Sequence, residues 1–185
     1  MPVSDISIFT IGHSNVTAYK LIELLKSQDV KILVDVRSFP YSKYNPQFNK
    51  EQLRRAVQKA GLKYHYAGES LGGRPDNPCC YKNGKIPDGR ADYLHIVDYK
   101  VVMNMPSFQE GISQLLDLAK NERVVIMCSE EDPNKCHRHH LIGKYLVDQG
   151  IEVLHIRAEG ELIRDQLLAN LTEKPSAEQL NLFED

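Results

Sequence analysis

Short β-branched apolar segments alternate with amphipathic helical segments along the chain, and this alternation limits the fold more than any other feature. The five apolar segments are residues 6–12, 30–37, 62–67, 123–128 and 151–156. Strands that alternate with helices build a mostly parallel sheet with both faces covered. We therefore predict an α/β fold, a single three-layer domain with a mostly parallel sheet of about five strands and helices on both faces.

The helical segments and the length of the chain complete this organisation. Helices are predicted at residues 17–28, 49–61, 91–103, 106–120 and 136–149. A chain of 185 residues with 42% hydrophobic content fits one domain with its own core. We predict an α/β domain over residues 1–165 and a tail over residues 166–185.

The lack of a recognisable targeting signal and the pattern of cysteines predict a cytoplasmic protein. The first residues lack a basic segment followed by a long apolar one, and no apolar run reaches the length of a membrane span. The four cysteines, two of them adjacent, do not form a disulfide framework. We expect a cytoplasmic, thiol-containing protein without a membrane partner.

Polar side chains follow the predicted strands at the points where the strands end. The carboxyl ends of parallel strands meet at one edge of a sheet, where α/β proteins form their binding sites. The polar side chains therefore predict a pocket at that edge. Those that follow the strands are His13, Asp35, Arg37, Tyr41, Glu69, Arg74, Cys128, Glu130, Glu131, Arg157 and Glu159.

The segment "VVIMCSEEDPNKCHRHHLIGKY", residues 124–145, leaves several kinds of site open. A zinc site usually has closely spaced ligands, whereas Cys128 and Cys136 lie eight residues apart. We expect no metal or cofactor, although His137 and His13 keep zinc open as an alternative. A phosphatase-type loop is rejected because the acidic residues between the cysteines would repel phosphate, and the same objection weakens a sulfurtransferase.

An anion-binding helix start is the preferred interpretation of this segment. If Cys136 to Arg138 form the first turn of a helix, their free N–H groups and the helix dipole attract negative charge. Arg138 can add a bidentate contact to an anion. The same field lowers the pKa of the Cys136 thiol. We expect His137 and Arg138 to point towards the pocket.

Four ordered blocks of the sequence resemble one known family. The blocks are "TIGHSN", "LVDVRSFPYSKYNPQF", "YAGESLGGR" and "MCSEEDPNKCHR". Together they are similar to the DUF488 family, whose function is unassigned, over roughly residues 8–156. The resemblance implies an α/β domain but no reaction. Its matching polar positions are His13, Asp35, Arg37, Glu69, Arg74, Cys128, Glu130, Cys136, His137 and Arg138.

The tail ends in "QLNLF", residues 179–183, which resembles the pentapeptide that docks bacterial repair proteins on the sliding clamp. Leu180, Leu182 and Phe183 can fill an apolar pocket, and Gln179 can supply hydrogen bonds. The alternative is a terminal helix packed on the domain. A clamp partner implies DNA. The net charge of +6 over residues 31–65 (eight basic, two acidic) indicates either an anionic partner or an ordinary solvated helix face.

These observations lead to one preferred function and two alternatives. We predict a bacterial DNA- or nucleotide-processing enzyme, of hydrolytic or base-excision type. Its predicted catalytic residues are Asp35, Glu69, Cys136 and His137. Its predicted substrate-binding residues are His13, Arg37, Tyr41, Arg74, Cys128, Glu130 and Arg138. The alternatives are a non-catalytic nucleic-acid-binding module and a small-molecule enzyme that uses the Cys136 thiolate.

Overall fold

The computed structural model describes residues 6–88 and 91–166, which form a six-stranded sheet in the order β3-β2-β4-β1-β5-β6. The first five strands are parallel, and β6 is antiparallel to β5. This confirms the predicted fold class. The sixth strand was not predicted, because it is short and lies in a charged stretch. The strands are β1 (Ser7–Gly12), β2 (Ile32–Asp35), β3 (Lys63–Tyr66), β4 (Val124–Cys128), β5 (Glu152–Ile156) and β6 (Leu162–Arg164).

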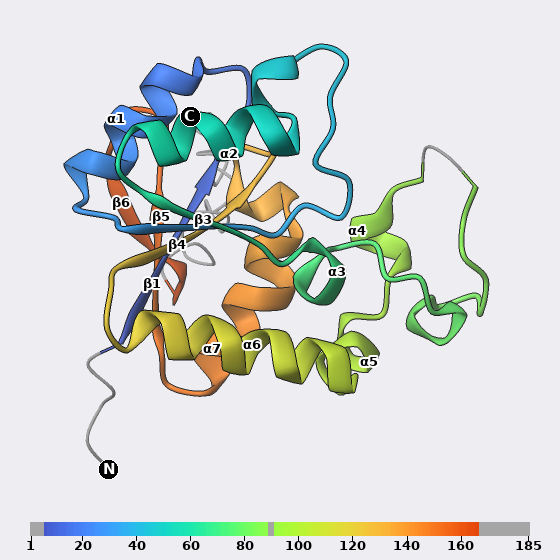
Figure 1. Ribbon diagram of the computed structural model, residues 1–185. Coiled ribbons are helices and arrows are strands. Elements are labelled where there is room, and N and C mark those ends of the chain that lie inside the picture. Colours follow the sequence, from blue (N-terminus) through green and yellow to red (C-terminus); the bar gives the residue numbers. More distant parts are fainter. Residues whose placement is uncertain (1–5, 89–90, 167–185) are drawn as a thin grey trace, which may run out of the picture.

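The two faces of the sheet pack against separate hydrophobic cores, as β4 illustrates. Val124 and Ile126 belong to one core, and Val125 and Met127 to the other, because successive side chains of a strand point to opposite faces. Helices α1 (Ala18–Ser27) and α2 (Lys50–Lys59) cover one face, and α6 (Pro106–Ala119) and α7 (Lys144–Asp148) cover the other (Figure 1). The arrangement is the predicted three-layer one.

Short helices occupy the connection between β3 and α6. They are α3 (Gly68–Leu71), the 3-10 turn η2 (Pro78–Cys80), α4 (Tyr93–Ile96) and α5 (Tyr99–Met103). One helix was predicted over residues 91–103, but two are found. Val97 is extended between them and forms a β-bridge with Tyr81. This bridge interrupts the helix and ties the long loop to the domain.

The helix predicted to begin at Cys136 begins later. Cys136 has an extended backbone, with φ −138°, and follows the 3-10 turn η3 (Pro133–Lys135). A π-helix, η4 (Arg138–Gly143), comes next and leads directly into α7. Cys136 therefore precedes the helix instead of belonging to its first turn. A further 3-10 turn, η1 (Pro46–Phe48), precedes α2.

Two further predictions concern the clamp-binding tail and the absence of a membrane span. Gln179, Leu180, Leu182 and Phe183, predicted to bind the sliding clamp, lie outside the described residues. Within residues 6–88 and 91–166, no helix combines the length and apolar character needed to cross a membrane.

Candidate functional site

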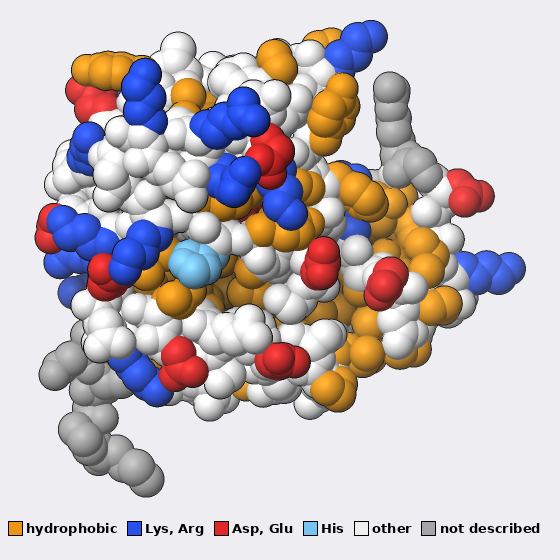
Figure 2. Space-filling model, in the orientation of Figure 1, with side chains coloured by type: hydrophobic (Ala, Val, Ile, Leu, Met, Phe, Trp, Pro, Cys, Tyr) orange, Lys and Arg blue, Asp and Glu red, His pale blue; other side chains and the backbone are white. Residues whose placement is uncertain are grey.

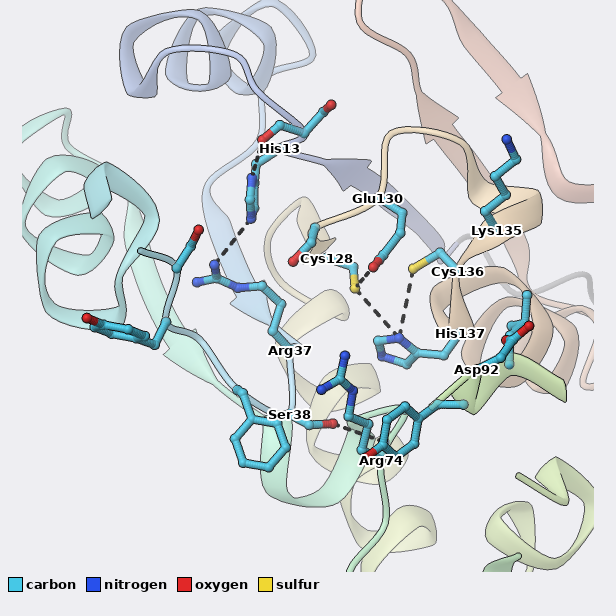
Figure 3. A pocket seen from close by; sticks show the side chains of 18 of the residues that line it. His13, Arg37, Ser38, Arg74, Asp92, Cys128, Glu130, Lys135, Cys136 and His137 are labelled. Atoms are coloured by element: carbon cyan, nitrogen blue, oxygen red, sulfur yellow. Dashed lines mark hydrogen bonds between the residues drawn. The ribbon is translucent and has the colours of Figure 1, made fainter. Parts of the chain in front are cut away.

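A pocket of about 610 Å³ opens at the carboxyl ends of the parallel strands, where the sequence predicted it. His13 follows β1, Arg37 follows β2, and Cys128 ends β4. Figure 3 shows these side chains converging from separate elements. Of the eleven predicted catalytic and substrate-binding residues, eight line the pocket: His13, Arg37, Tyr41, Arg74, Cys128, Glu130, Cys136 and His137.

The two predicted catalytic carboxylates lie outside the pocket lining. Asp35 is fully buried, and both of its oxygens are used. Oδ1 accepts from Arg37 Nε at 2.8 Å, and Oδ2 accepts from Arg37 Nη2 at 2.6 Å and from the Tyr64 hydroxyl at 2.8 Å. Glu69 is exposed on α3. Their positions do not support the roles predicted for them, because neither side chain borders the space where a substrate would lie.

Arg138 was predicted to bind a substrate anion, but its guanidinium points into the protein. It is fully buried and donates from Nε to Thr10 Oγ1 at 3.2 Å. Its other nitrogens donate to the backbone carbonyls of Glu130 and Glu131. Arg138 therefore holds the loop between β4 and η3 in place, and these contacts occupy the groups that an anion would need.

His13 and Arg37 form one wall of the pocket. Because a guanidinium only donates, Arg37 Nη1 donates to His13 Nε2 at 3.3 Å, and His13 Nδ1 donates to the Ser14 carbonyl at 2.8 Å. The His13 ring also stacks on the ring of Phe48, with 4.1 Å between the ring centroids. Burial, assisted by the charge of Arg37, lowers the pKa of His13 to about 4. His13 is therefore a neutral side chain at pH 7.

The floor of the pocket brings together two thiols, an imidazole and a carboxylate (Figure 3). His137 Nδ1 lies 3.6 Å from Cys128 Sγ and 3.8 Å from Cys136 Sγ. Its Nε2 donates to the Val36 carbonyl at 3.2 Å, so Nδ1 faces the sulfurs. Cys128 Sγ donates to Glu130 Oε2 at 3.0 Å. Cys128, Cys136 and His137 are 5%, 1% and 9% exposed, so these residues are buried although all three line the pocket.

The groups at the floor shift one another's pKa values. Burial raises the pKa of the Cys136 thiol, but the adjacent Cys128 thiol and the positive charges of His137 and Arg138 lower it well below its usual range. The pKa of the Cys128 thiol is raised instead, because the neighbouring Cys136 sulfur and burial both disfavour its ionised form. Glu130 is an exposed residue of the pocket lining, yet desolvation by the surrounding protein and the charge of Cys136 raise its pKa.

The rim of the pocket carries aromatic and cationic side chains. Phe39 and Tyr41 are 68% and 74% exposed. The Arg74 guanidinium lies over the ring of Tyr93 at 4.4 Å and near that of Phe39 at 5.7 Å. Lys135 is exposed at the same pocket. Phe39, Tyr93 and Lys135 were not predicted as site residues, although the aromatic content of residues 38–48 was a usable signal for Phe39.

Fold and site together define an α/β protein with a Cys-Cys-His-Glu pocket at the carboxyl edge of a parallel sheet. The chain matches the family described as "Domain of unknown function DUF488" over residues 17–145, and it belongs to this family. No curated protein and no solved structure matches it. The family does not assign a reaction, so the function has to be argued from the pocket.

Proposed function

We propose that the chain is a hydrolytic enzyme that binds a nucleotide unit in this pocket, either as a free nucleotide or as part of a single strand. One observation carries the proposal. The exposed rings of Phe39 and Tyr41 and the cation of Arg74 stand at the rim of a pocket whose floor holds Cys136, His137 and Glu130.

The aromatic rim supports binding of a planar ring. Exposed large aromatic side chains keep apolar surface in contact with water until a partner covers it. A nucleobase is a partner of matching shape. Tyr44, three residues after Tyr41 in the chain, is also 89% exposed. Stacking on one base contributes about 1–3 kcal/mol.

The cations of the pocket support binding of a phosphate group. Arg74 and Lys135 are exposed at the rim of the pocket. Guanidinium groups bind phosphate through paired, charge-assisted hydrogen bonds. Lys and Arg side chains also gather on the upper part of the face shown in Figure 2, over α2. A volume of about 610 Å³ is in the range that holds a ligand of nucleotide size.

Glu130 is the carboxylate that supports hydrolysis. It replaces Asp35 and Glu69 in this role, because it lines the pocket beside Cys128. Its raised pKa suits a group that takes a proton from water and returns it to a leaving group. The overall reaction then adds water across the bond that breaks.

The test replaces one rim aromatic and compares it with a matched side chain elsewhere. Tyr41→Ala should weaken nucleotide binding about tenfold, because one stacking contact is lost. Tyr19→Ala is the control, since Tyr19 is 77% exposed and lies outside the pocket lining. Isothermal titration with nucleoside phosphates and with short single-stranded oligonucleotides distinguishes the two sources of the ligand.

Chromatography of the same mixtures tests the enzymatic part of the proposal. New products that disappear in Glu130→Gln would support hydrolysis. Salt-dependent binding without any product would instead indicate a non-catalytic binding module. Equal binding by the Tyr41 and Tyr19 variants, or no binding to either class of ligand, would overturn the proposal.

We also propose, from the sequence alone, that the C-terminal segment "QLNLF" docks on a bacterial sliding clamp. Full-length protein should bind the clamp, and a version that ends at Ala177 should not, because it lacks Gln179 and the apolar residues that follow. Surface plasmon resonance with both versions provides the measurement. Equal binding by both would refute the role of the tail.

A further inference from the structure

Three ligand atoms converge at the floor of the pocket: the sulfurs of Cys128 and Cys136 and Nδ1 of His137. All three lie within 4.8 Å of one another. We propose that these residues bind one Zn²⁺ ion and leave its fourth position open to the pocket beside Glu130. Metal binding is independent of the function proposed above, whereas the role of the metal in hydrolysis rests on it.

The distances fit a tetrahedral ion. Zinc bonds of about 2.3 Å to sulfur and about 2.0 Å to nitrogen, at tetrahedral angles, place sulfur and nitrogen about 3.6 Å apart. The observed separations from His137 Nδ1 are 3.6 Å to Cys128 Sγ and 3.8 Å to Cys136 Sγ. A single proton on Nδ1 could be directed at only one of these sulfurs, while a metal ion bonds to both.

The surroundings orient the ligands as metal sites require. A metal-binding histidine usually donates its other ring nitrogen to an oxygen acceptor, and His137 Nε2 donates to the Val36 carbonyl. Gly73 lies against the imidazole ring, where a Cβ atom would approach His137 Cγ to 2.6 Å. The Arg138 N–H donates to Cys136 Sγ at 3.4 Å. These contacts restrict the rotation of His137 and Cys136.

Burial favours a metal ligand over a thiol nucleophile. A nucleophile has to be reached by the substrate, but Cys136 is only 1% exposed. Metal ligands can be buried, because the ion itself presents the reactive position. Three protein ligands with an open fourth position are typical of catalytic zinc, which activates a bound water. Glu130, 3.0 Å from Cys128 Sγ, can accept the proton that this water releases.

A second cluster, formed by His139, His155 and Asp165, does not support the same conclusion. Its ligand atoms also lie within 4.8 Å of one another. However, the Asp165 carboxylate only accepts hydrogen bonds, so the ring proton of neutral His155 sits on Nε2, and Nδ1 accepts from the Thr10 hydroxyl at 2.6 Å. His155 Nε2 donates to Asp165 at 3.0 Å. Hydrogen bonds therefore account for both nitrogens of His155.

The experiment is a metal titration of the reduced full-length protein without nucleotide. Cobalt(II) is the probe, because thiolate ligands give a charge-transfer band and tetrahedral geometry gives intense visible bands. Added Zn²⁺ should abolish both sets of bands. We expect one equivalent of metal per chain, with the charge-transfer band reduced by about half in Cys128→Ser and Cys136→Ser and the visible bands altered in His137→Ala. Cys79→Ser is the matched control, since Cys79 is an exposed cysteine and should leave the spectrum unchanged.

The outcomes separate this proposal from the nucleotide proposal. Stoichiometric, thiolate-dependent metal binding supports the zinc site even if no nucleotide binds. The absence of thiolate-to-cobalt bands in folded wild-type protein overturns it, whatever nucleotides do. Circular dichroism confirms that the variants are folded, and the wild-type titration decides the question if they are not. Rapid alkylation of Cys136 by iodoacetamide in the presence of excess Zn²⁺ would also overturn it and favour a thiolate enzyme.

Discussion

Asp165 is a buried carboxylate held between two imidazole rings. It is 7% exposed, and its Oδ2 accepts from His139 Nδ1 at 2.8 Å and from His155 Nε2 at 3.0 Å. Burial alone raises its pKa, but the hydrogen bonds and charges of these histidines lower it from 3.8 to about 2. Ionised Asp165 therefore stabilises the fold by linking η4, β5 and the end of β6.

Replacement of Asp165 by Asn should cost about 1–3 kcal/mol of unfolding free energy at neutral pH. The folded pKa lies below the unfolded value of 3.8, so the contribution is fully present above about pH 4 and is lost as the pH falls towards 2. Urea denaturation of wild type and Asp165→Asn at a series of pH values measures the difference.

The control for this prediction is Asp29→Asn. Asp29 forms an ion pair with Lys31 on the surface, where its side chain is 71% exposed, and such pairs contribute little. A pH-independent difference for Asp165→Asn would contradict the ionic explanation, because the amide would then be acting through packing alone.

At the scale of elements, the loop that follows β4 is held by hydrogen bonds from η4 and from the residues after β1, and it packs against the end of β1. The carbonyl groups of Glu130 and Glu131 accept from Arg138, and Ser14 N–H donates to the Ser129 carbonyl at 2.8 Å. Gly12 ends β1 directly beneath this loop. A Cβ atom on Gly12 would lie 1.7 Å from the Glu130 carbonyl oxygen, so only glycine allows the approach.

Gly12→Ala should therefore displace the loop that carries Glu130 and lower the melting temperature by several degrees. We expect a loss of about 2 kcal/mol or more, because the obstacle is backbone and cannot rotate away. Gly61→Ala makes the same chemical change where nothing lies within 4 Å, and only its φ of 84° opposes it. That control should lose about 1 kcal/mol. Equal losses in calorimetry would refute the steric argument.

At the scale of the whole molecule, the strand order places the pocket. The two central strands, β4 and β1, are neighbours, although β4 follows β1 by more than a hundred residues. Cys128 at the end of β4 therefore meets His13 after β1 and Arg37 after β2. Ligand sites in open α/β sheets lie at this edge, where loops from non-consecutive strands come together.

The same strand order predicts how stability is distributed. Amide hydrogens of β4 and β1 should exchange most slowly, because both strands are central and buried on both faces. Those of β6 should exchange faster, since it is a three-residue edge strand with Leu162 43% exposed. Hydrogen exchange followed by mass spectrometry tests this. Protection of β6 equal to that of β4 would contradict it.

The sequence by itself determined the fold class and the edge of the sheet at which the pocket lies. Alternating apolar and amphipathic segments require a covered parallel sheet, and parallel strands carry their carboxyl ends to one edge. The break at Val97 and the late start of the helix after Cys136 could not be predicted, because both depend on contacts with other segments. The bridge from Tyr81 and the hydrogen bond from His137 Nε2 to the Val36 carbonyl are such contacts.

Only the tertiary structure decided which side chains enter the pocket and which support it. Arg138 turns inward because the hydroxyl of Thr10, 128 positions away in the chain, accepts a hydrogen bond from its Nε. Nδ1 of His137 faces the two sulfurs because the carbonyl of Val36, 101 positions away, accepts a hydrogen bond from Nε2. The same folding brings Cys128 and Cys136 together despite their spacing. Hydrogen bonds between distant segments set these directions, and such partners cannot be identified from local sequence patterns.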